Sequence, residues 1–170
     1  AYSEDTGFNP LKLADTELGV ITTGLGKNYY EENLGDLGSN PSHLHIGFYP
    51  VPKEKINKLA AHVKKLLIIE EGYPVVETSL RGILPQDIEI SGKLDGKIPM
   101  TGELDPDVVR PAMGLPEINT VKVDNLPGRP PQLCQGCPHI DSYEAINNAI
   151  KEYPRSIVAS DIGCYSLGAL

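Results

Sequence analysis

Apolar positions in the first half of the chain form short continuous runs separated by a helical stripe. The runs at 18–23 (LGVITT) and 66–70 (LLIIE) predict buried strands, and 43–48 (HLHIGF) alternates polar and apolar side chains as a strand does. In 53–65 the apolar residues recur at helical spacing, which predicts an amphipathic helix with its lysines in water. Shorter helices are predicted at 28–34 and 74–81. Strands alternating with helices over short connections predict a parallel α/β sheet.

The second half of the chain loses this alternation. Residues 85–126 are rich in proline and glycine with scattered apolar pairs, which predicts a connecting segment interrupted by one capped helical turn at 105–109 that Pro111 limits. Order is predicted to resume with a helix that Ser142 caps and a strand at 156–160 (SIVAS). One helix and one strand cannot bury both faces of a sheet. The predicted division is therefore an α/β domain at 1–84, a linker at 85–126 and an incomplete α/β domain at 127–170.

Charge and composition exclude several classes of protein. The chain has 15 Lys and Arg against 23 Asp and Glu, a formal charge of −8, so phosphate backbones would be repelled and no nucleic-acid partner is expected. No apolar run approaches the roughly 20 residues of a membrane span, and no signal-peptide pattern begins the chain. Three cysteines, an odd number, do not resemble a secreted disulfide framework. We expect a cytoplasmic protein, and the start at Ala1 rather than Met suggests a processed or excised piece.

The strongest chemical motif is LCQGCPH at 133–139, followed by Cys164. The CxxC spacing lets Cys134 and Cys137 converge on one metal or cluster, and Cys164 could close the site from the opposite side. Three soft ligands suit iron–sulfur or zinc, with His139 or a group outside the chain as the fourth ligand. Buried structural thiols are the alternative interpretation. A redox disulfide of the thioredoxin type is less favoured, because no strand precedes Cys134.

Other features allow ordinary structural interpretations. The loop 22–27 (TTGLGK) could offer backbone amides to a phosphate, but it matches neither common phosphate-binding glycine pattern, and a tight turn explains it equally. Glu70 and Glu71 follow a predicted strand, where adjacent side chains point to opposite faces, so a hydrogen-bonding or interface role is favoured over an acid/base pair. His43 and His45 share one strand face without a third ligand nearby, which favours surface or packed histidines.

The order of five segments resembles a known family. The segments are GVITTGLGKNYY, LLIIEEGYP, MTGELDPDVV, LCQGCPH and SDIGCYSLG. Together they resemble the middle of the large (alpha) subunit of indolepyruvate ferredoxin oxidoreductase, a member of the thiamine-diphosphate-dependent 2-oxoacid:ferredoxin oxidoreductases. The resemblance implies that 1–84 is similar to the C-terminal domain of transketolases, a βαβ module that assists assembly. It further implies that 127–170 is the truncated start of a thiamine-diphosphate-binding α/β domain.

The resemblance also implies a reaction and its components. The family oxidatively decarboxylates an arylpyruvate to an aryl-acetyl-CoA and passes the electrons through [4Fe-4S] clusters to ferredoxin. Thiamine diphosphate with Mg²⁺ is the electron sink, and the protein supplies binding and orientation. The implied partners are a small beta subunit, ferredoxin, CoA and the arylpyruvate, with no nucleic acid and no membrane.

Site residues follow from the same resemblance, position by position. It implies that Cys134, Cys137 and Cys164 are cluster ligands whose fourth partner falls beyond Leu170. It implies further that the following residues lie near the cofactor pocket: Gly136, Cys137, Pro138, His139, Asp161, Gly163 and Cys164. No catalytic residue is assigned. The acidic Mg²⁺ motif belongs further downstream, and Asp161 does not replace it, so the isolated chain is expected to hold none of these cofactors tightly and to be inactive.

Two alternative functions remain open on the sequence. One is a self-contained metal or iron–sulfur module with the ligands Cys134, Cys137, His139 and Cys164. The other is a purely structural assembly domain that binds no ligand. Both alternatives share the α/β core with the enzyme hypothesis.

Overall fold

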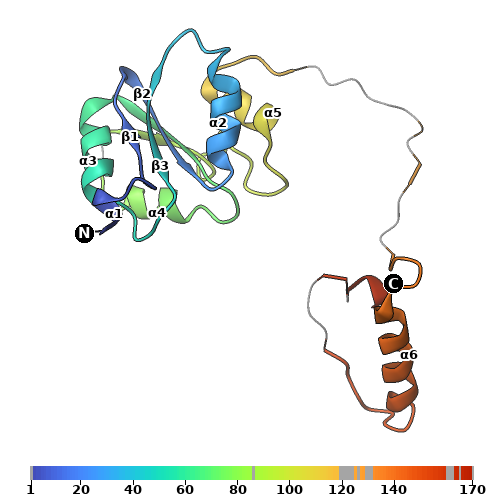
Figure 1. Ribbon diagram of the computed structural model, residues 1–170. Helices are drawn as coiled ribbons and strands as arrows, with labels where there is room; N and C mark the ends of the chain where they lie inside the picture. Colours follow the sequence, from blue (N-terminus) through green and yellow to red (C-terminus); the bar gives the residue numbers. More distant parts are fainter. Residues whose placement is uncertain are drawn as a thin grey trace. The chain divides into compact units, whose positions relative to one another are not determined.

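The computed structural model describes residues 2–85, 87–118, 125, 127–128, 132–159, 163–164 and 166–169 (Figure 1). The chain divides into two compact units, 1–120 and 121–170. The first unit carries the sheet, and the second carries the cysteine motif.

The first unit is built on a five-stranded sheet with strand order β1-β3-β2-β4-β5. The strands are β1 (Leu11–Lys12), β2 (Asp15–Thr23), β3 (Pro41–Ile46), β4 (Lys65–Ile69) and β5 (Glu89–Ser91). The pairs β2/β3, β2/β4 and β4/β5 are parallel, which confirms the predicted α/β sheet. The prediction missed β1, a two-residue edge strand antiparallel to β3. The three predicted strands are present with their boundaries shifted by one to three residues.

Helices cover both faces of this sheet, as Figure 1 shows. The helices of this unit are α1 (Tyr2–Asp5), α2 (Gly26–Leu34), α3 (Lys53–His62), α4 (Val75–Arg81), α5 (Pro106–Val109) and the 3₁₀ helix η1 (Arg110–Met113), and of these α1 contacts α3. On β2, Ile21 joins the core formed with α3 and α4, whereas its neighbour Val20 joins the core formed with α2, α5 and η1. Burial on both faces explains why the strands are continuous apolar runs in the sequence.

The prediction that 85–126 is a connecting segment is wrong for much of the described part of that range. Strand β5 extends the sheet, and residues from 98 to 113 join α2 in the apolar cover of one face. The buried side chains of this segment are Ile98, Leu104, Val109 and Met113. Proline and glycine are frequent here because the chain turns often between these few anchors, and composition alone cannot distinguish that from a connector.

The predicted helical turn after Asp105 is present and longer than expected. The Asp105 carboxylate accepts a hydrogen bond from the Val108 amide at 2.7 Å, as an N-cap residue should. Pro111 does not end the turn, because it occupies the first turn of η1, where its missing N–H costs nothing. The helical path ends instead at Gly114, which adopts φ +83.

A residue of the N-terminal segment, far from α3 in the sequence, caps the start of α3. Pro52 at the N-cap offers no side-chain hydrogen bond. Both oxygens of the Glu4 carboxylate instead accept from the amides of Glu54 and Lys55, at 3.0 and 3.3 Å. A negative charge here also complements the helix dipole. α3 ends at His62 rather than at the predicted Lys65, because the chain extends from Val63 into β4.

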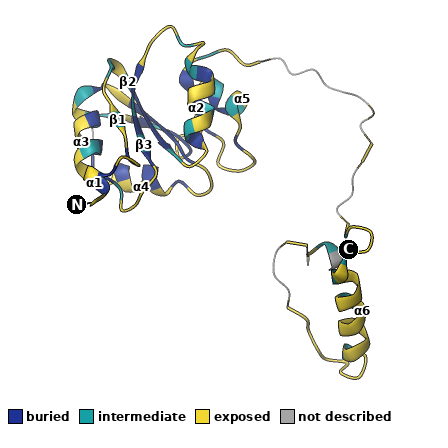
Figure 2. Cartoon of the chain, in the orientation of Figure 1, coloured by how far each residue is buried: buried dark blue, intermediate teal, exposed yellow. Residues whose placement is uncertain are grey.

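The second unit contains one α-helix, α6 (Pro138–Ile150), and the 3₁₀ helix η2 (Ser166–Ala169) in its described residues. α6 begins four residues before the predicted cap, and the hydroxyl of Ser142 donates to the Pro138 carbonyl instead of capping. No residue of α6 is buried, as Figure 2 shows by its colour. The predicted strand at 156–160 is wrong for its described residues 156–159, which pair with no described strand. Ser160 lies outside the described residues.

Candidate functional site

The carboxyl edge of the sheet has a topological switch point between β2 and β4. These strands are neighbours, and the helices that follow them, α2 and α4, pack on opposite faces. Loops that diverge in this way leave a crevice, which is where open α/β sheets usually bind ligands. A pocket of about 290 Å³ lies here, lined by Leu25, Tyr29, Glu71, Gly72, Lys93, Gly102, Glu103 and Leu104.

The two adjacent glutamates after β4 are engaged separately. Glu70 is 3% exposed, and its carboxylate accepts from the amides of Val76 and Glu77 at 3.0 and 2.9 Å, capping α4. Burial raises the pKa of Glu70 against the opposing effect of these two hydrogen bonds. Glu71 accepts from the Tyr29 hydroxyl at 2.6 Å. The preferred hydrogen-bonding role is confirmed for both, and they do not form an acid/base pair.

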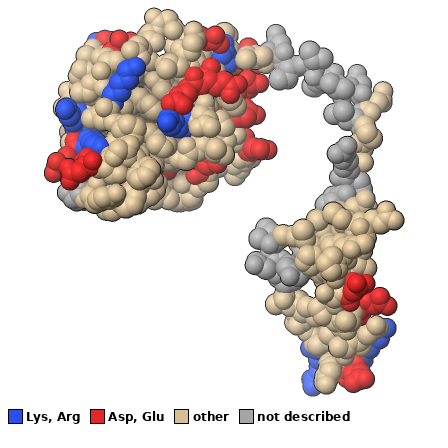
Figure 3. Space-filling view, in the orientation of Figure 1, with Lys and Arg blue, Asp and Glu red and all other residues tan. Residues whose placement is uncertain are grey.

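Acidic groups dominate the surroundings of Tyr29. The hydrogen bond to Glu71, then burial, then the charges of Glu71, Glu103 and Asp105 raise the pKa of Tyr29 to about 12. Figure 3 shows acidic side chains gathered on the part of the first unit that carries α2 and α5. Tyr29 therefore stays protonated and donates, and the crevice is an unfavourable place for an anion.

The glycine loop after β2 is a tight turn into α2. A Cβ on Gly26 would lie 2.5 Å from the carbonyl oxygen of Ile69, so only glycine allows α2 to start against β4. Gly24 adopts φ +50 in the same loop. The close approach at Gly26 and the positive φ of Gly24 account for the two glycines without a phosphate.

His43 and His45 share a single hydroxyl group. The Oγ1 of Thr22 lies 2.9 Å from His43 Nε2 and 3.0 Å from His45 Nδ1, and the His43 ring packs on Tyr30 with centroids 4.4 Å apart. Burial, the neighbouring His45 and the charges of Lys27 and Lys12 lower the pKa of His43 to about 4, and burial also lowers that of His45. These are packed, neutral histidines, as one of the two structural interpretations predicted.

The cysteine motif forms a turn directly before α6. The Cys137 amide donates to the Cys134 carbonyl at 3.0 Å, and Gly136 adopts φ +74 inside the turn. Cys137 is the N-cap residue of α6, and its Sγ lies 3.1 Å from His139 Nδ1. The three free thiols of the chain are exposed or partly exposed. The structure thus brings Cys134, Cys137 and His139 to the start of one helix, with Pro138 as the first helical residue.

The remaining predicted site residues do not complete a metal centre. Gly163 and Cys164 are described and exposed, and Asp161 lies outside the described residues. In the part of the chain that the structure describes, no three His, Cys, Asp or Glu side chains are grouped so that they could hold a metal ion. The ligand set of the self-contained metal module, Cys134, Cys137, His139 and Cys164, is therefore not assembled.

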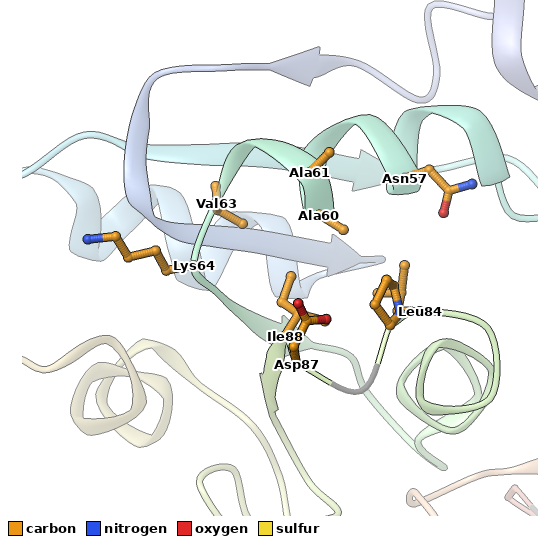
Figure 4. Close-up of a pocket in the computed structure, with 9 residues that line it drawn as sticks. Asn57, Ala60, Ala61, Val63, Lys64, Leu84, Asp87 and Ile88 are labelled. Carbon is orange, nitrogen blue, oxygen red and sulfur yellow. The ribbon is translucent and has the colours of Figure 1, made fainter.

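A larger pocket lies at the opposite edge of the sheet. It has a volume of about 640 Å³ between the end of α3, the start of β4 and the segment after α4, and Figure 4 shows the side chains that line it. The charged groups in this lining are Lys64 and Asp87, and no nucleophile is among them. Its chemistry therefore makes it a poorer functional candidate than the smaller crevice or the cysteine motif.

The architecture defines the chain as an α/β sheet unit joined to a CxxC-bearing helical segment. No family model and no solved structure matches it. Curated relatives do match, and they are named indolepyruvate oxidoreductase subunit IorA. The protein from Methanothermobacter thermautotrophicus is 36% identical over 168 aligned positions, which cover 91% of this chain and 27% of that protein. Those from Archaeoglobus fulgidus and Pyrococcus horikoshii are 31% and 35% identical and cover 98% and 92% of this chain.

The chain is thus similar to a segment of proteins named indolepyruvate oxidoreductase subunit IorA, which confirms the resemblance found in the sequence. It spans about a quarter of the length of the curated relatives that it matches. Among the described residues, no helix has the length and apolar character needed to cross a membrane.

Proposed function

We propose that this chain is part of an oxidoreductase that oxidatively decarboxylates arylpyruvates to aryl-acetyl-CoA and transfers the electrons to ferredoxin. The observation that carries the proposal is the similarity to IorA subunits over 91 to 98% of the chain. Because the relatives are named as subunits, the proposal includes a smaller partner subunit.

The second unit would contribute the residues nearest the cofactors. Cys134, Cys137 and Cys164 are the proposed cluster ligands, and all three thiols are accessible enough to be ligated. Gly136, Pro138, His139, Asp161 and Gly163 are the proposed neighbours of thiamine diphosphate. The cofactor would supply the electron sink, and these residues would bind and orient it.

The first unit would serve assembly rather than chemistry. In its described residues every buried side-chain nitrogen or oxygen has a hydrogen-bond partner. Its buried carboxylates stabilise helix ends and loops, as Glu70 does at α4. This use of its ionisable groups supports a structural module in the larger enzyme.

The test uses the complete gene product that contains this chain, produced anaerobically together with its partner subunit. We expect reduction of ferredoxin that requires an arylpyruvate, CoA and thiamine diphosphate. Cys137→Ala should abolish this reduction, whereas Lys64→Gln, on the surface of the first unit, should leave it unchanged. An assembled complex, loaded with thiamine diphosphate, that reduces ferredoxin with none of the arylpyruvates would contradict the proposal.

The chain of 170 residues by itself should show no turnover and only weak binding of thiamine diphosphate. A diphosphate needs a cation and a closed pocket to compensate its charges, and this chain has a formal charge of −8. Titration calorimetry with thiamine diphosphate and Mg²⁺ measures this directly. Binding at micromolar concentration or tighter would show that the chain carries a complete pocket.

A further inference from the structure

The cysteines before α6 form a geometry that metal ligation alone does not require. We propose that Cys134 and Cys137, when they carry no metal, are a redox-active dithiol that closes into an intramolecular disulfide, with Cys137 as the attacking thiol and His139 as its positioning partner. This proposal concerns the metal-free chain and does not depend on the proposed function.

The first support is the turn that joins the two cysteines. The hydrogen bond from the Cys137 amide to the Cys134 carbonyl, at 3.0 Å, closes a four-residue turn with Gly136 at its third position. The φ of +74 at Gly136 is the value that a type II turn requires there. Such a turn brings its first and last Cα atoms within about 7 Å, which overlaps the range that disulfides span. The two sulfur atoms can therefore bond with little backbone movement.

The second support distinguishes Cys137 from the other two thiols. Cys137 is the N-cap residue of a 13-residue helix, and its thiol is partly exposed. Its Sγ makes no capping hydrogen bond and instead lies 3.1 Å from His139 Nδ1. Cys134, the first residue of the turn, is exposed and can reach the Cys137 sulfur as the resolving thiol. From the sequence, disulfide chemistry is less favoured because no strand precedes Cys134. The structure removes this objection, because the turn itself brings the two cysteines close together.

The reaction balances with a low-molecular-weight disulfide as the oxidant. The Cys137 thiolate attacks one sulfur of oxidised glutathione, forming a mixed disulfide and releasing one glutathione thiolate. The Cys134 thiolate then attacks the Cys137 sulfur, forming the intramolecular bond and releasing the second glutathione thiolate. The two protons of the protein thiols pass to the two released thiolates. The protein loses two electrons, and the oxidant gains two.

The test treats the full chain, stripped of metal by a chelator, with oxidised glutathione and follows it by mass spectrometry with peptide mapping. We expect a product lighter by two hydrogen atoms with Cys134 linked to Cys137, while Cys164 stays a thiol. In Cys134→Ser the reaction should stop at a glutathione adduct on Cys137. His139→Gln should slow the first step by about tenfold, and Ser142→Ala, on the same helix, should not.

The result that would overturn the proposal is equal modification of all three cysteines without an internal bond. Far-ultraviolet circular dichroism would show whether His139→Gln unfolds α6. If it does, the Cys134→Ser variant still tests the proposal. An adduct on Cys164 formed as fast as the one on Cys137 contradicts the proposal, and selective trapping at Cys137 supports it.

Discussion

At the scale of single residues, the buried charges of the first unit act mainly on the backbone. Glu77 is fully buried, and one of its oxygens accepts from the Arg81 guanidinium while the other accepts from the amides of Lys93 and Leu94. The Glu77 carboxylate thus links the turn after β5 to α4 by hydrogen bonds. The sequence gives no signal for this role, because Glu77 looks like any polar residue of an amphipathic helix.

Replacing Glu77 by alanine should lower the free energy of unfolding by about 3 kcal/mol, because the Arg81 charge and two amides would lose their acceptor. Glu89→Ala, which removes an exposed carboxylate on β5, should change it by less than about 0.5 kcal/mol. Urea unfolding followed by circular dichroism compares the two variants. Equal effects would mean that the buried contacts contribute nothing beyond surface charge.

The Thr22, His43 and His45 cluster predicts an acid-sensitive first unit. The pKa of His43 is lowered to about 4 in the folded chain, against about 6.5 in an unfolded chain. Between these values the unfolded chain binds a proton that the folded chain does not, so stability falls as the pH falls, by at most about 1.4 kcal/mol per pH unit. Besides His45, the groups that face His43 are Lys27 from α2, Lys12 from β1 and the Tyr30 ring.

The measurement is the unfolding free energy from pH 8 to pH 4 for the unchanged chain and for His43→Gln. The variant keeps a hydrogen-bonding side chain but cannot titrate, so it should show a shallower loss of stability on the acid side. The two slopes should coincide above about pH 7, where His43 is neutral in both states. Identical slopes at acid pH would contradict the assignment to His43.

At the scale of elements, α3 and α4 obtain their N-terminal caps in the same way. Each follows a proline that offers no side-chain cap, and each receives one carboxylate that accepts from its second and third amides. Glu4 supplies this cap for α3 and Glu70 for α4. The helices themselves were predictable from apolar spacing. Their caps were not, because the carboxylates that accept these hydrogen bonds lie in other elements.

The adjacent glutamates after β4 allow a matched test of helix capping. Glu70→Ala should lower the unfolding free energy by about 2 kcal/mol, because two buried amides of α4 lose their acceptor. Glu71→Ala removes only an exposed hydrogen bond with Tyr29 and should cost about 0.5 kcal/mol or less. Chemical denaturation of both variants gives the comparison, and a larger effect at Glu71 would contradict the capping role.

At the scale of the whole molecule, both apolar cores of the first unit are formed by residues no later than Met113. The face that carries Val20 and Leu67 is covered by α2, which contributes Tyr30, and by residues that follow Ile90, from Ile98 to Met113. A domain boundary at 84 would keep α2 on this face but remove Ile98, Leu104, Val109 and Met113, and so would expose much of the core to water. Packing therefore places the end of the first unit after Met113, whereas the composition places it at residue 84.

Two truncations decide between these boundaries. Residues 1–120 should fold alone and unfold within about two degrees of the midpoint that the full chain shows for this unit. Residues 1–84 should fail to fold, because the core on the α2 face of the sheet loses Ile98, Leu104, Val109 and Met113, and β5 is also removed. Thermal unfolding by circular dichroism with amide NMR spectra tests both. A cooperative unfolding transition in 1–84 would contradict this prediction and would support a domain boundary at residue 84.

The sequence by itself determined the alternation of strands and helices in the first unit, the position of the cysteine motif and the relationship to the IorA subunits. These follow from local periodicity and from residue order, which need no knowledge of distant contacts. Only the tertiary structure decided that 88–113 belongs to the core, that Glu4, Glu70 and Glu77 hold helix ends and turns, and that Cys137 meets His139 at a helix start. A side chain's partner depends on where the chain folds back, and composition carries no record of that position.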